Sequence, residues 1–157
     1  MEDGGPPVIL SAGRLSAQKD YPTLIKAFSR VAEERPCRLI ILGEGRRRRR
    51  LERLLKNLGL TDRASLPGWV DNPFAFMSRA ALFVLSSRYE GLPGVLIQAL
   101  ACGSPCVSTD CPTGPAEILR GGELGPLVPV GDPLPLAEAM TSVLERPRPR
   151  KARIIRG

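Results

Sequence analysis

Short apolar runs alternate along the chain with stretches in which apolar residues recur every three or four positions. The run at residues 8–12 is typical of a buried strand, and the spacing within residues 21–35 is typical of an amphipathic helix. Asp20 is expected to cap that helix. Further strands are expected over residues 38–42, 65–66, 81–85, 106–108 and 127–130, and further helices over residues 51–58, 71–77, 95–102, 115–119 and 133–144.

Regular alternation of strand and helix predicts an α/β fold: a Rossmann-like parallel sheet flanked by helices on both faces. The 157 residues fit one domain, expected over residues 1–145, with a basic C-terminal tail over residues 146–157. Ligands of such sheets bind at the carboxyl ends of the strands. The loops that follow strands therefore hold the candidate residues, and Gly43 begins one of them.

The net charge of +7 favours anionic partners, although much of it lies in the run 46–50 and in the tail. The arginine run has two interpretations, a nucleic-acid patch or a solvated helix face. No aromatic residues are interleaved with it for base stacking, so the solvated face is favoured and no nucleic-acid partner is expected.

Four cysteines without paired spacing, and no histidine, argue against a zinc site and against a Cys/His nucleophile. Free thiols in a reducing cytosol are expected, with no metal and no cofactor. The sequence has no signal-peptide pattern and no apolar run near the roughly 20 residues that span a bilayer. A cytoplasmic location is therefore expected, with contact to a membrane surface left open only through a larger parent protein.

The loop after the first strand offers a possible phosphate clamp. Gly13 allows a tight turn, Arg14 can grip a phosphate through two bonds, and Lys19 adds a mobile positive charge. A merely solvated basic loop is an equally good interpretation of these residues.

A second candidate is the turn between the strand at 81–85 and the following apolar helix. It comprises Glu90, Gly91, Leu92, Pro93 and Gly94. Free amides at the helix start favour an anion, and the carboxylate of Glu90 could bind sugar hydroxyls or stabilise positive charge. Glu90 could equally complement the helix dipole, which from these residues alone is the simpler role. Gln98 interrupts the apolar helix and needs a partner, either a ligand hydroxyl or a neighbouring loop.

The segment Gly43-Glu44-Gly45 lacks the full dinucleotide fingerprint, and no P-loop pattern occurs. Both absences argue against a dinucleotide-dependent dehydrogenase and against a P-loop kinase.

Five segments occur in an order that is specific as a set: SAGRLSAQKDYPTLIKAF, LIILGEG, LPGWVDNP, ALFVLSSRYEGLPGVLIQALACGSPCVSTDCPTGPAEIL and GPLVPVGDPLPLAEAM. Together they cover about residues 8–145. This set resembles the C-terminal, donor-binding domain of the retaining glycosyltransferases of family 4, or group 1, which include sucrose synthase and bacterial mannosyltransferases. The resemblance implies one half of a GT-B fold, which needs no metal, and a nucleotide-diphosphate sugar as partner.

The resemblance also implies roles for single residues. Arg14 and Lys19 match the basic pair that binds the diphosphate, and Glu90 matches the acid that contacts the donor sugar and is the candidate catalytic residue. The stretch from Gly91 to Gly94 matches the turn whose amides face the phosphates and the sugar. Trp69 and Val70 match the loop against which the base packs.

The chain departs from the family pattern in two ways. Gln98 occupies the position of the second signature acid, expected to hold the ribose, so ribose binding should be retuned. The acceptor-binding N-terminal domain, which often supplies a catalytic histidine, is missing. Transfer is therefore expected only together with that domain, and a non-catalytic nucleotide-sugar or protein-interaction module remains the alternative.

Overall fold

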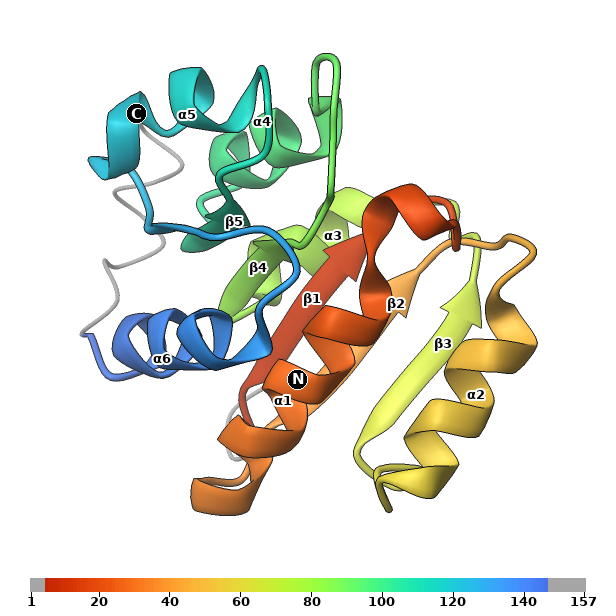
Figure 1. The fold of residues 1–157 in the computed structure, drawn as a ribbon. Coiled ribbons are helices and arrows are strands. Elements are labelled where there is room, and N and C mark those ends of the chain that lie inside the picture. Colours follow the sequence, from red (N-terminus) through yellow and green to blue (C-terminus); the bar gives the residue numbers. More distant parts are fainter. Residues whose placement is uncertain (1–4, 147–157) are drawn as a thin grey trace.

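The computed structural model describes residues 5–146, and most of the predicted tail, residues 147–157, lies outside them (Figure 1). Six parallel strands form one sheet in the order β3-β2-β1-β4-β5-β6. The strands are β1 (Val8–Ala12), β2 (Arg38–Leu42), β3 (Ala64–Gly68), β4 (Leu82–Leu85), β5 (Cys106–Thr109) and β6 (Leu127–Val128). The predicted α/β, Rossmann-like fold is thus confirmed.

Helices cover both faces of the sheet. They are α1 (Tyr21–Glu34), α2 (Arg48–Asn57), α3 (Pro73–Arg79), α4 (Gly94–Ala101), α5 (Pro115–Ile118) and α6 (Pro133–Leu144), with short 3-10 turns η1 (Ala17–Lys19) and η2 (Arg120–Gly122). In Figure 1, α1, α2 and α6 lie in front of the sheet, and α3 and α4 lie behind it. No helix within residues 5–146 is long and apolar enough to cross a membrane.

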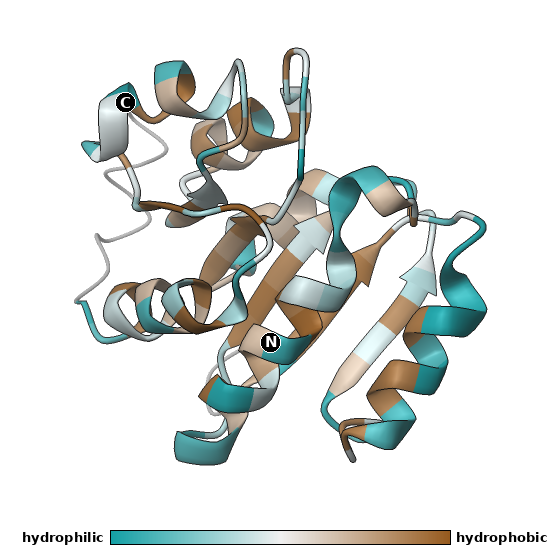
Figure 2. Cartoon of the chain, in the orientation of Figure 1, coloured by the Kyte–Doolittle hydropathy of each residue, from teal (hydrophilic) through white to brown (hydrophobic). Residues whose placement is uncertain are grey.

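Alternation along the buried strands divides the core into two layers. On β1, Ile9 belongs to the layer beneath α1, α2 and α6, whereas Leu10 belongs to the layer with α3 and α4. Val84 and Leu85 divide in the same way on β4. Figure 2 shows the result: brown strands at the centre, and helices whose outer surfaces are largely teal. The central strands are therefore apolar on both faces, as a parallel sheet requires.

The strand order creates a topological switch point between β1 and β4. From β1 the chain moves outward through β2 to β3, and it then returns to add β4 on the opposite side of β1. The loops after β1 and β4 consequently diverge at the carboxyl edge of the sheet. Such a divergence leaves a crevice where ligands of doubly wound sheets bind.

Two local expectations about helix starts were met only in part, since Asp20 does occupy the N-cap position of α1. Asp20 does not cap α1 with its side chain: its backbone is left-handed (φ 50°), and its carboxylate accepts the hydroxyl of Thr23 and pairs with Arg88. The arginine run only partly occupies a helix, because α2 begins at Arg48. That first arginine binds Glu44 four residues earlier, which offsets the unfavourable position of a cation there.

The outer strands differ from expectation in length. β3 continues to Gly68, beyond the two residues expected, and β6 contains only two residues. Pro129 follows β6 and has no amide to extend the ladder. The four cysteines are free thiols, as expected, three of them buried.

Candidate functional site

A cavity of about 320 Å³ opens at the carboxyl edge of the sheet, at the switch point between β1 and β4. Most of the predicted site residues line it: Gly13, Arg14, Lys19, Trp69, Val70, Glu90, Leu92, Pro93, Gly94 and Gln98. We call it the switch-point cavity. Two predicted residues, Gly43 and Gly91, do not line it. Gly43 instead packs against the backbone of Gly13, in the loop that follows β1.

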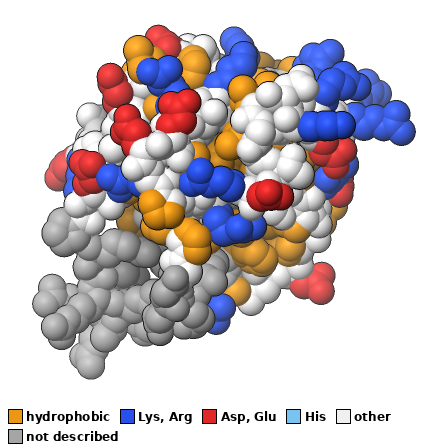
Figure 3. Space-filling model, turned by 90° about the horizontal axis from the view of Figure 1, so that it is seen from below, with side chains coloured by type: hydrophobic (Ala, Val, Ile, Leu, Met, Phe, Trp, Pro, Cys, Tyr) orange, Lys and Arg blue, Asp and Glu red, His pale blue; other side chains and the backbone are white. Residues whose placement is uncertain are grey.

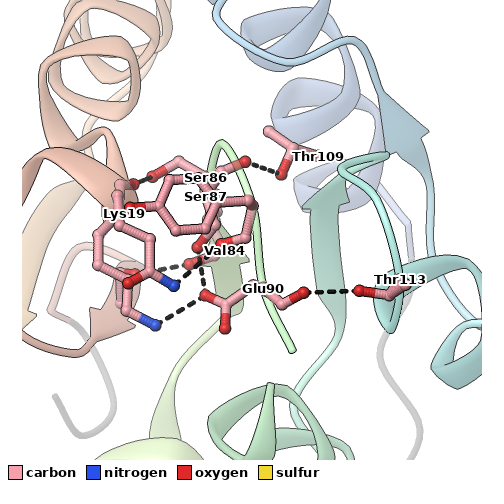
Figure 4. A network of polar contacts seen from close by, with 10 residues as sticks. Lys19, Val84, Ser86, Ser87, Glu90, Thr109 and Thr113 are labelled. Atoms are coloured by element: carbon pink, nitrogen blue, oxygen red, sulfur yellow. Dashed lines mark hydrogen bonds and ion pairs between the residues drawn. The ribbon is translucent and has the colours of Figure 1, made fainter. Parts of the chain in front are cut away.

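An ion pair between Lys19 and Glu90 lies in this cavity. The Nζ–Oε2 distance is 2.7 Å, and the side chains are only 15% and 6% exposed. The two residues are 71 positions apart, and the switch point brings them together from the end of η1 and from the loop after β4 (Figure 4). Each charge is satisfied by the other, as a nearly buried pair requires.

Hydroxyl groups fix Glu90 in place (Figure 4). Ser87 Oγ donates to Glu90 Oε2 at 2.5 Å, and Thr113 Oγ1 donates to the backbone carbonyl of Glu90 at 2.7 Å. Ser87 is itself held, because Thr109 Oγ1 donates to its carbonyl at 2.7 Å. Glu90 Oε2 is thus occupied, whereas Oε1 accepts no hydrogen bond from residues 5–146.

Lys19 is fixed from the other side of the switch point. Its backbone carbonyl accepts a hydrogen bond from Ser86 Oγ at 2.7 Å. Its side chain passes close to Gly13, where an added Cβ would lie 3.0 Å from Lys19 Cε and 3.0 Å from the hydroxyl oxygen of Tyr21. Gly13 also has φ 154°, so a glycine is needed there for backbone and space alike.

The hydroxyl of Tyr21 is a polar group in this region that the sequence did not indicate. Tyr21 is 1% exposed, and its hydroxyl has no hydrogen-bond partner within the described part of the chain. Burial raises the pKa of Tyr21 far above its ordinary value. The side chain of Ser11 lies close to this hydroxyl without forming such a bond, and a buried hydroxyl without a partner lowers the stability of the fold.

Part of the lining of this cavity is apolar. Val70, Pro73, Met77 and Val95 line it, and the ring of Trp69 is 67% exposed beside them. A flat ring could stack there, since exposed aromatic faces favour such contacts.

Gln98 lies on the wall of the cavity, but not in a buried helix, so that premise was wrong. In α4 only Leu96 and Ala99 are buried, whereas Gln98 is exposed and its side-chain amide makes no hydrogen bond to any residue of 5–146. The start of α4 also has fewer free amides than expected, because Gly94 N donates to the carbonyl of Leu92 at 2.8 Å. The side chain of Gln98 therefore faces a ligand space unpaired.

The sequence model of the family described as Glycosyl transferases group 1 matches residues 6–146. The chain belongs to this glycosyltransferase family. Among residues 5–146 of this family member, no group of three or more Cys, Asp or Glu side chains is placed to hold a metal ion. Positive charge in the switch-point cavity comes from Arg14 and Lys19 instead.

Two relatives of this chain with similar sequences are described as glycosyltransferases. It is 45% identical over 113 residues to the uncharacterized glycosyltransferase MJ1059 of Methanocaldococcus jannaschii, covering 71% of this chain and 28% of that protein. It is also similar to the N-acetylgalactosamine-N,N'-diacetylbacillosaminyl-diphospho-undecaprenol 4-alpha-N-acetylgalactosaminyltransferase of Campylobacter jejuni. The two are 36% identical over 144 residues, which cover 92% of this chain and 39% of that protein.

Among solved structures, Anabaena Alr3699/HepE in complex with UDP-glucose superposes with a TM-score of 0.81 and 25% identity, covering 89% of this chain and 39% of that one. The chain thus spans between about a quarter and two fifths of the length of these group 1 relatives.

Sequence reasoning missed the supports beneath the two charged residues. Ser86 and Ser87 end the buried β4 run, and two polar residues in succession at the carboxyl end of a buried strand could have marked them. Thr109 follows the same rule at the end of β5. Thr113 had no comparable signal, because its bond to Glu90 depends on its left-handed backbone (φ 51°).

Proposed function

We propose that this chain is the donor-binding, C-terminal half of a retaining glycosyltransferase that moves a sugar from a nucleotide-diphosphate sugar to an acceptor. The observation that carries the proposal is the nearly buried Lys19–Glu90 pair at the switch point. It lies in a cavity lined by the cations Arg14 and Lys19 and by apolar and aromatic side chains, which suits a ligand that carries both a diphosphate and a base. The solved relative with UDP-glucose bound supports the same class of ligand.

Lys19 and Arg14 bind the diphosphate. The guanidinium of Arg14 is exposed at the cavity and makes no ion pair within residues 5–146, so it is available to a phosphate. Lys19 turns from Glu90 toward the ligand when the donor enters. Both cations then stabilise the charge that develops on the leaving diphosphate, which is the main electrostatic demand of the transfer.

Glu90 positions the sugar and is the catalytic carboxylate. Ser87 holds its Oε2 atom independently of Lys19, which leaves Oε1 free for sugar hydroxyls. Its negative charge also favours positive charge developing on the sugar ring during transfer. Because the hydroxyl network fixes this carboxylate before the donor arrives, little reorganisation is needed at the reaction step.

The remaining residues of the cavity bind the nucleoside. The base packs between Trp69, Val70 and Leu92, and Gln98 binds the ribose hydroxyls as a neutral donor and acceptor. Gly43 takes part indirectly, because it allows the close approach of its own backbone to that of Gly13.

Transfer itself needs the acceptor-binding N-terminal domain of a longer protein. We infer that anomeric configuration is retained and that no metal takes part, since Arg14 and Lys19 supply the charge for the leaving group. The parent protein is placed in the cytoplasm, at a membrane surface if its acceptor is lipid-linked.

The decisive experiment is a thermal-shift panel with UDP, GDP, ADP and their common sugar conjugates. A ligand at 100 times its Kd should stabilise the chain by about 2.7 kcal/mol. We expect one base to be preferred, with the shift lost in Lys19→Ala and reduced for sugar conjugates, but not for the free diphosphate, in Glu90→Gln. Lys56→Ala, on the exposed side of α2, is the matched control and should change nothing.

Two outcomes would contradict the proposal. A shift that survives in Lys19→Ala would place the nucleotide elsewhere on the molecule. No shift with any nucleotide would favour the alternative, a non-catalytic interaction module.

A further inference from the structure

A second cavity, of about 300 Å³, lies on the other side of the β1–α1 loop. We call it the basic cavity and define it by six of its lining residues, Ser16, Asp20, Lys26, Arg47, Arg88 and Gly131. The loop between β1 and α1 is shared: Gly13 and Lys19 face the switch-point cavity, whereas Ser16 and Asp20 face the basic cavity. Nothing in the proposed transfer reaction uses this second space.

The charges that line the basic cavity are not balanced. Asp20 is its one carboxylate, is 4% exposed, and already accepts the hydroxyl of Thr23 at 2.7 Å. Arg88 Nη2 lies 3.4 Å from the same carboxylate oxygen, and this guanidinium is 54% exposed, so most of its donors remain free. Lys26 and Arg47 make no ion pair within residues 5–146. Two positive charges are left over.

Arg88 is fixed in position by the loops around it. Its backbone amide donates to the carbonyl of Gln18 at 2.8 Å, and Gln18 Nε2 donates to the carbonyl of Tyr89 at 2.9 Å. Gly131 (φ 77°) lies against the guanidinium, and an added Cβ there would be 3.6 Å from Arg88 Nη1. The backbone that carries Arg88 is therefore held in place, and the guanidinium group has open space beside it.

Arg47 enters the cavity from a different loop that is equally fixed. Its amide donates to the carbonyl of Leu15 at 3.0 Å, and the amide of Leu15 donates to Glu44 at 2.9 Å. Leu15 is fully buried, which ties the two loops together. Arg47 stands just before α2, where the helix dipole disfavours a cation. No ion pair within residues 5–146 neutralises the charge of Arg47, and the dipole of α2 opposes it. An anionic ligand would stabilise that charge.

We propose that the basic cavity binds a phosphate group, as a phosphomonoester or a diphosphate, independently of the donor. Two planar guanidinium groups can each hold phosphate oxygens through paired hydrogen bonds, and Lys26 adds a mobile charge. The positive end of α1 also points into this region. A volume of about 300 Å³ is at the lower end of the range for ligand sites and is sufficient for such a group. This inference does not rest on the proposed function.

Other arginines of the run lie outside the cavity and attract anions without binding them at one place. Arg46, Arg49 and Arg50 are exposed, and Figure 3 shows Lys and Arg side chains gathered at the upper right, the side on which α2 lies. Such a patch raises the local concentration of anions. A test must therefore separate a defined site from general attraction.

The test is calorimetric titration with pyrophosphate at constant ionic strength, in a Lys19→Ala background that removes one of the two cations of the expected diphosphate clamp and leaves Glu90 unpaired beside the other. We expect one site to remain. It should weaken about tenfold or more in Lys26→Gln/Arg47→Gln, since each lost bond joins two charged groups. The matched control Arg49→Gln/Arg53→Gln removes the same charge from the exposed surface of α2 and should change the Kd less than twofold.

Vesicles of phosphatidylcholine with and without phosphatidic acid identify the source of the phosphate. Binding that needs phosphatidic acid and Arg47 assigns a lipid headgroup, and pyrophosphate binding without vesicle binding assigns a soluble phosphate. Equal loss in the two double variants, or no pyrophosphate binding in the Lys19→Ala background, would overturn the proposal. Nucleotide shifts in the otherwise unchanged chain would stand in either case, so the two proposals fail separately.

Discussion

The two cavities beside the β1–α1 loop differ in how their charges are balanced. In the switch-point cavity Lys19 and Glu90 lie 2.7 Å apart and neutralise each other. In the basic cavity Lys26 and Arg47 have no acidic partner within residues 5–146. The one carboxylate that lines this cavity, that of Asp20, pairs with Arg88. One loop of eight residues, 13–20, thus separates a cavity whose lysine is paired, beside the unpaired Arg14, from a cavity whose lysine has no ion pair within residues 5–146.

The two cavities thus show two arrangements of positive charge that can bind an anion. A paired cation costs the ligand-free protein little, but it must exchange one partner for another when the ligand binds. An unpaired cation is ready at once, but it depends on solvent and salt to screen it. The largest expected effects below act on the shared loop, and the smallest acts on the unpaired charges.

Gly43→Ala should break both cavities together. An added Cβ at Gly43 would lie 2.1 Å from the carbonyl oxygen of Gly13, and the backbone there has φ 130°, where a side chain is strained. We expect a loss of about 3–4 kcal/mol in the free energy of unfolding, measured by urea denaturation, because the contact is with backbone that cannot move aside.

The matched control is Gly91→Ala, where an added Cβ meets nothing within 4 Å. It should stay within about 0.5 kcal/mol of the unmodified chain. A Gly43→Ala protein of equal stability would mean that the close approach to Gly13 does not fix the shared loop.

Lys19→Met should unbalance the switch-point cavity alone. It leaves the carboxylate of Glu90, whose side chain is 6% exposed, with the hydroxyl of Ser87 as its one hydrogen-bond partner within residues 5–146. We expect about 2–3 kcal/mol of destabilisation, largely restored in Lys19→Met/Glu90→Gln. The same substitution at Lys26, an exposed and unpaired lysine of the basic cavity, should cost less than about 0.5 kcal/mol. Similar losses at both lysines would remove the contrast between the two sides.

The alternating pattern was sufficient to predict a parallel sheet and the edge at which ligands bind, because the hydrophobic period and the alternation of strands with helices follow from local sequence. Lys19 and Glu90 could be proposed as site residues for the same reason, since each follows a buried strand. Their pairing could not, because it joins residues 71 positions apart across the switch point. Asp20 was assigned to the helix cap because that rule is local, whereas its actual partner, Arg88, comes from another loop.

Tyr21→Phe should stabilise the ligand-free chain by about 1 kcal/mol at neutral pH, since it removes a buried hydroxyl that has no partner among the described residues. Burial raises the pKa of Tyr21, so the folded state keeps its proton longer than the unfolded state does. The stability linked to that proton is fully present below about pH 10 and falls as the pH rises further. Urea midpoints across this range should therefore fall less steeply in Tyr21→Phe.

Cys106 provides an internal reference for this pH dependence. Burial raises the pKa of its thiol to about 12, so its share of stability begins to fall near the ordinary thiol pKa of about 8.5. That earlier decline should persist in Tyr21→Phe and diminish in Cys106→Ala. If Tyr21→Phe instead destabilises the chain at neutral pH, its hydroxyl has a partner and is structural.

The smallest effect concerns salt. Arg47→Gln should raise the stability of the ligand-free chain by a few tenths of a kcal/mol at low ionic strength, because it removes a cation that lies near Arg88 in the basic cavity and just before α2. The gain should vanish near 1 M NaCl, where the screening length is about 3 Å, whereas the cost of Lys19→Met should hardly change with salt because that pair is nearly buried. A salt-independent effect of Arg47→Gln would mean that this arginine is engaged locally rather than left unbalanced. The charge of the basic cavity would then be structural, and the contrast between the two sides of the loop would be one of shape alone.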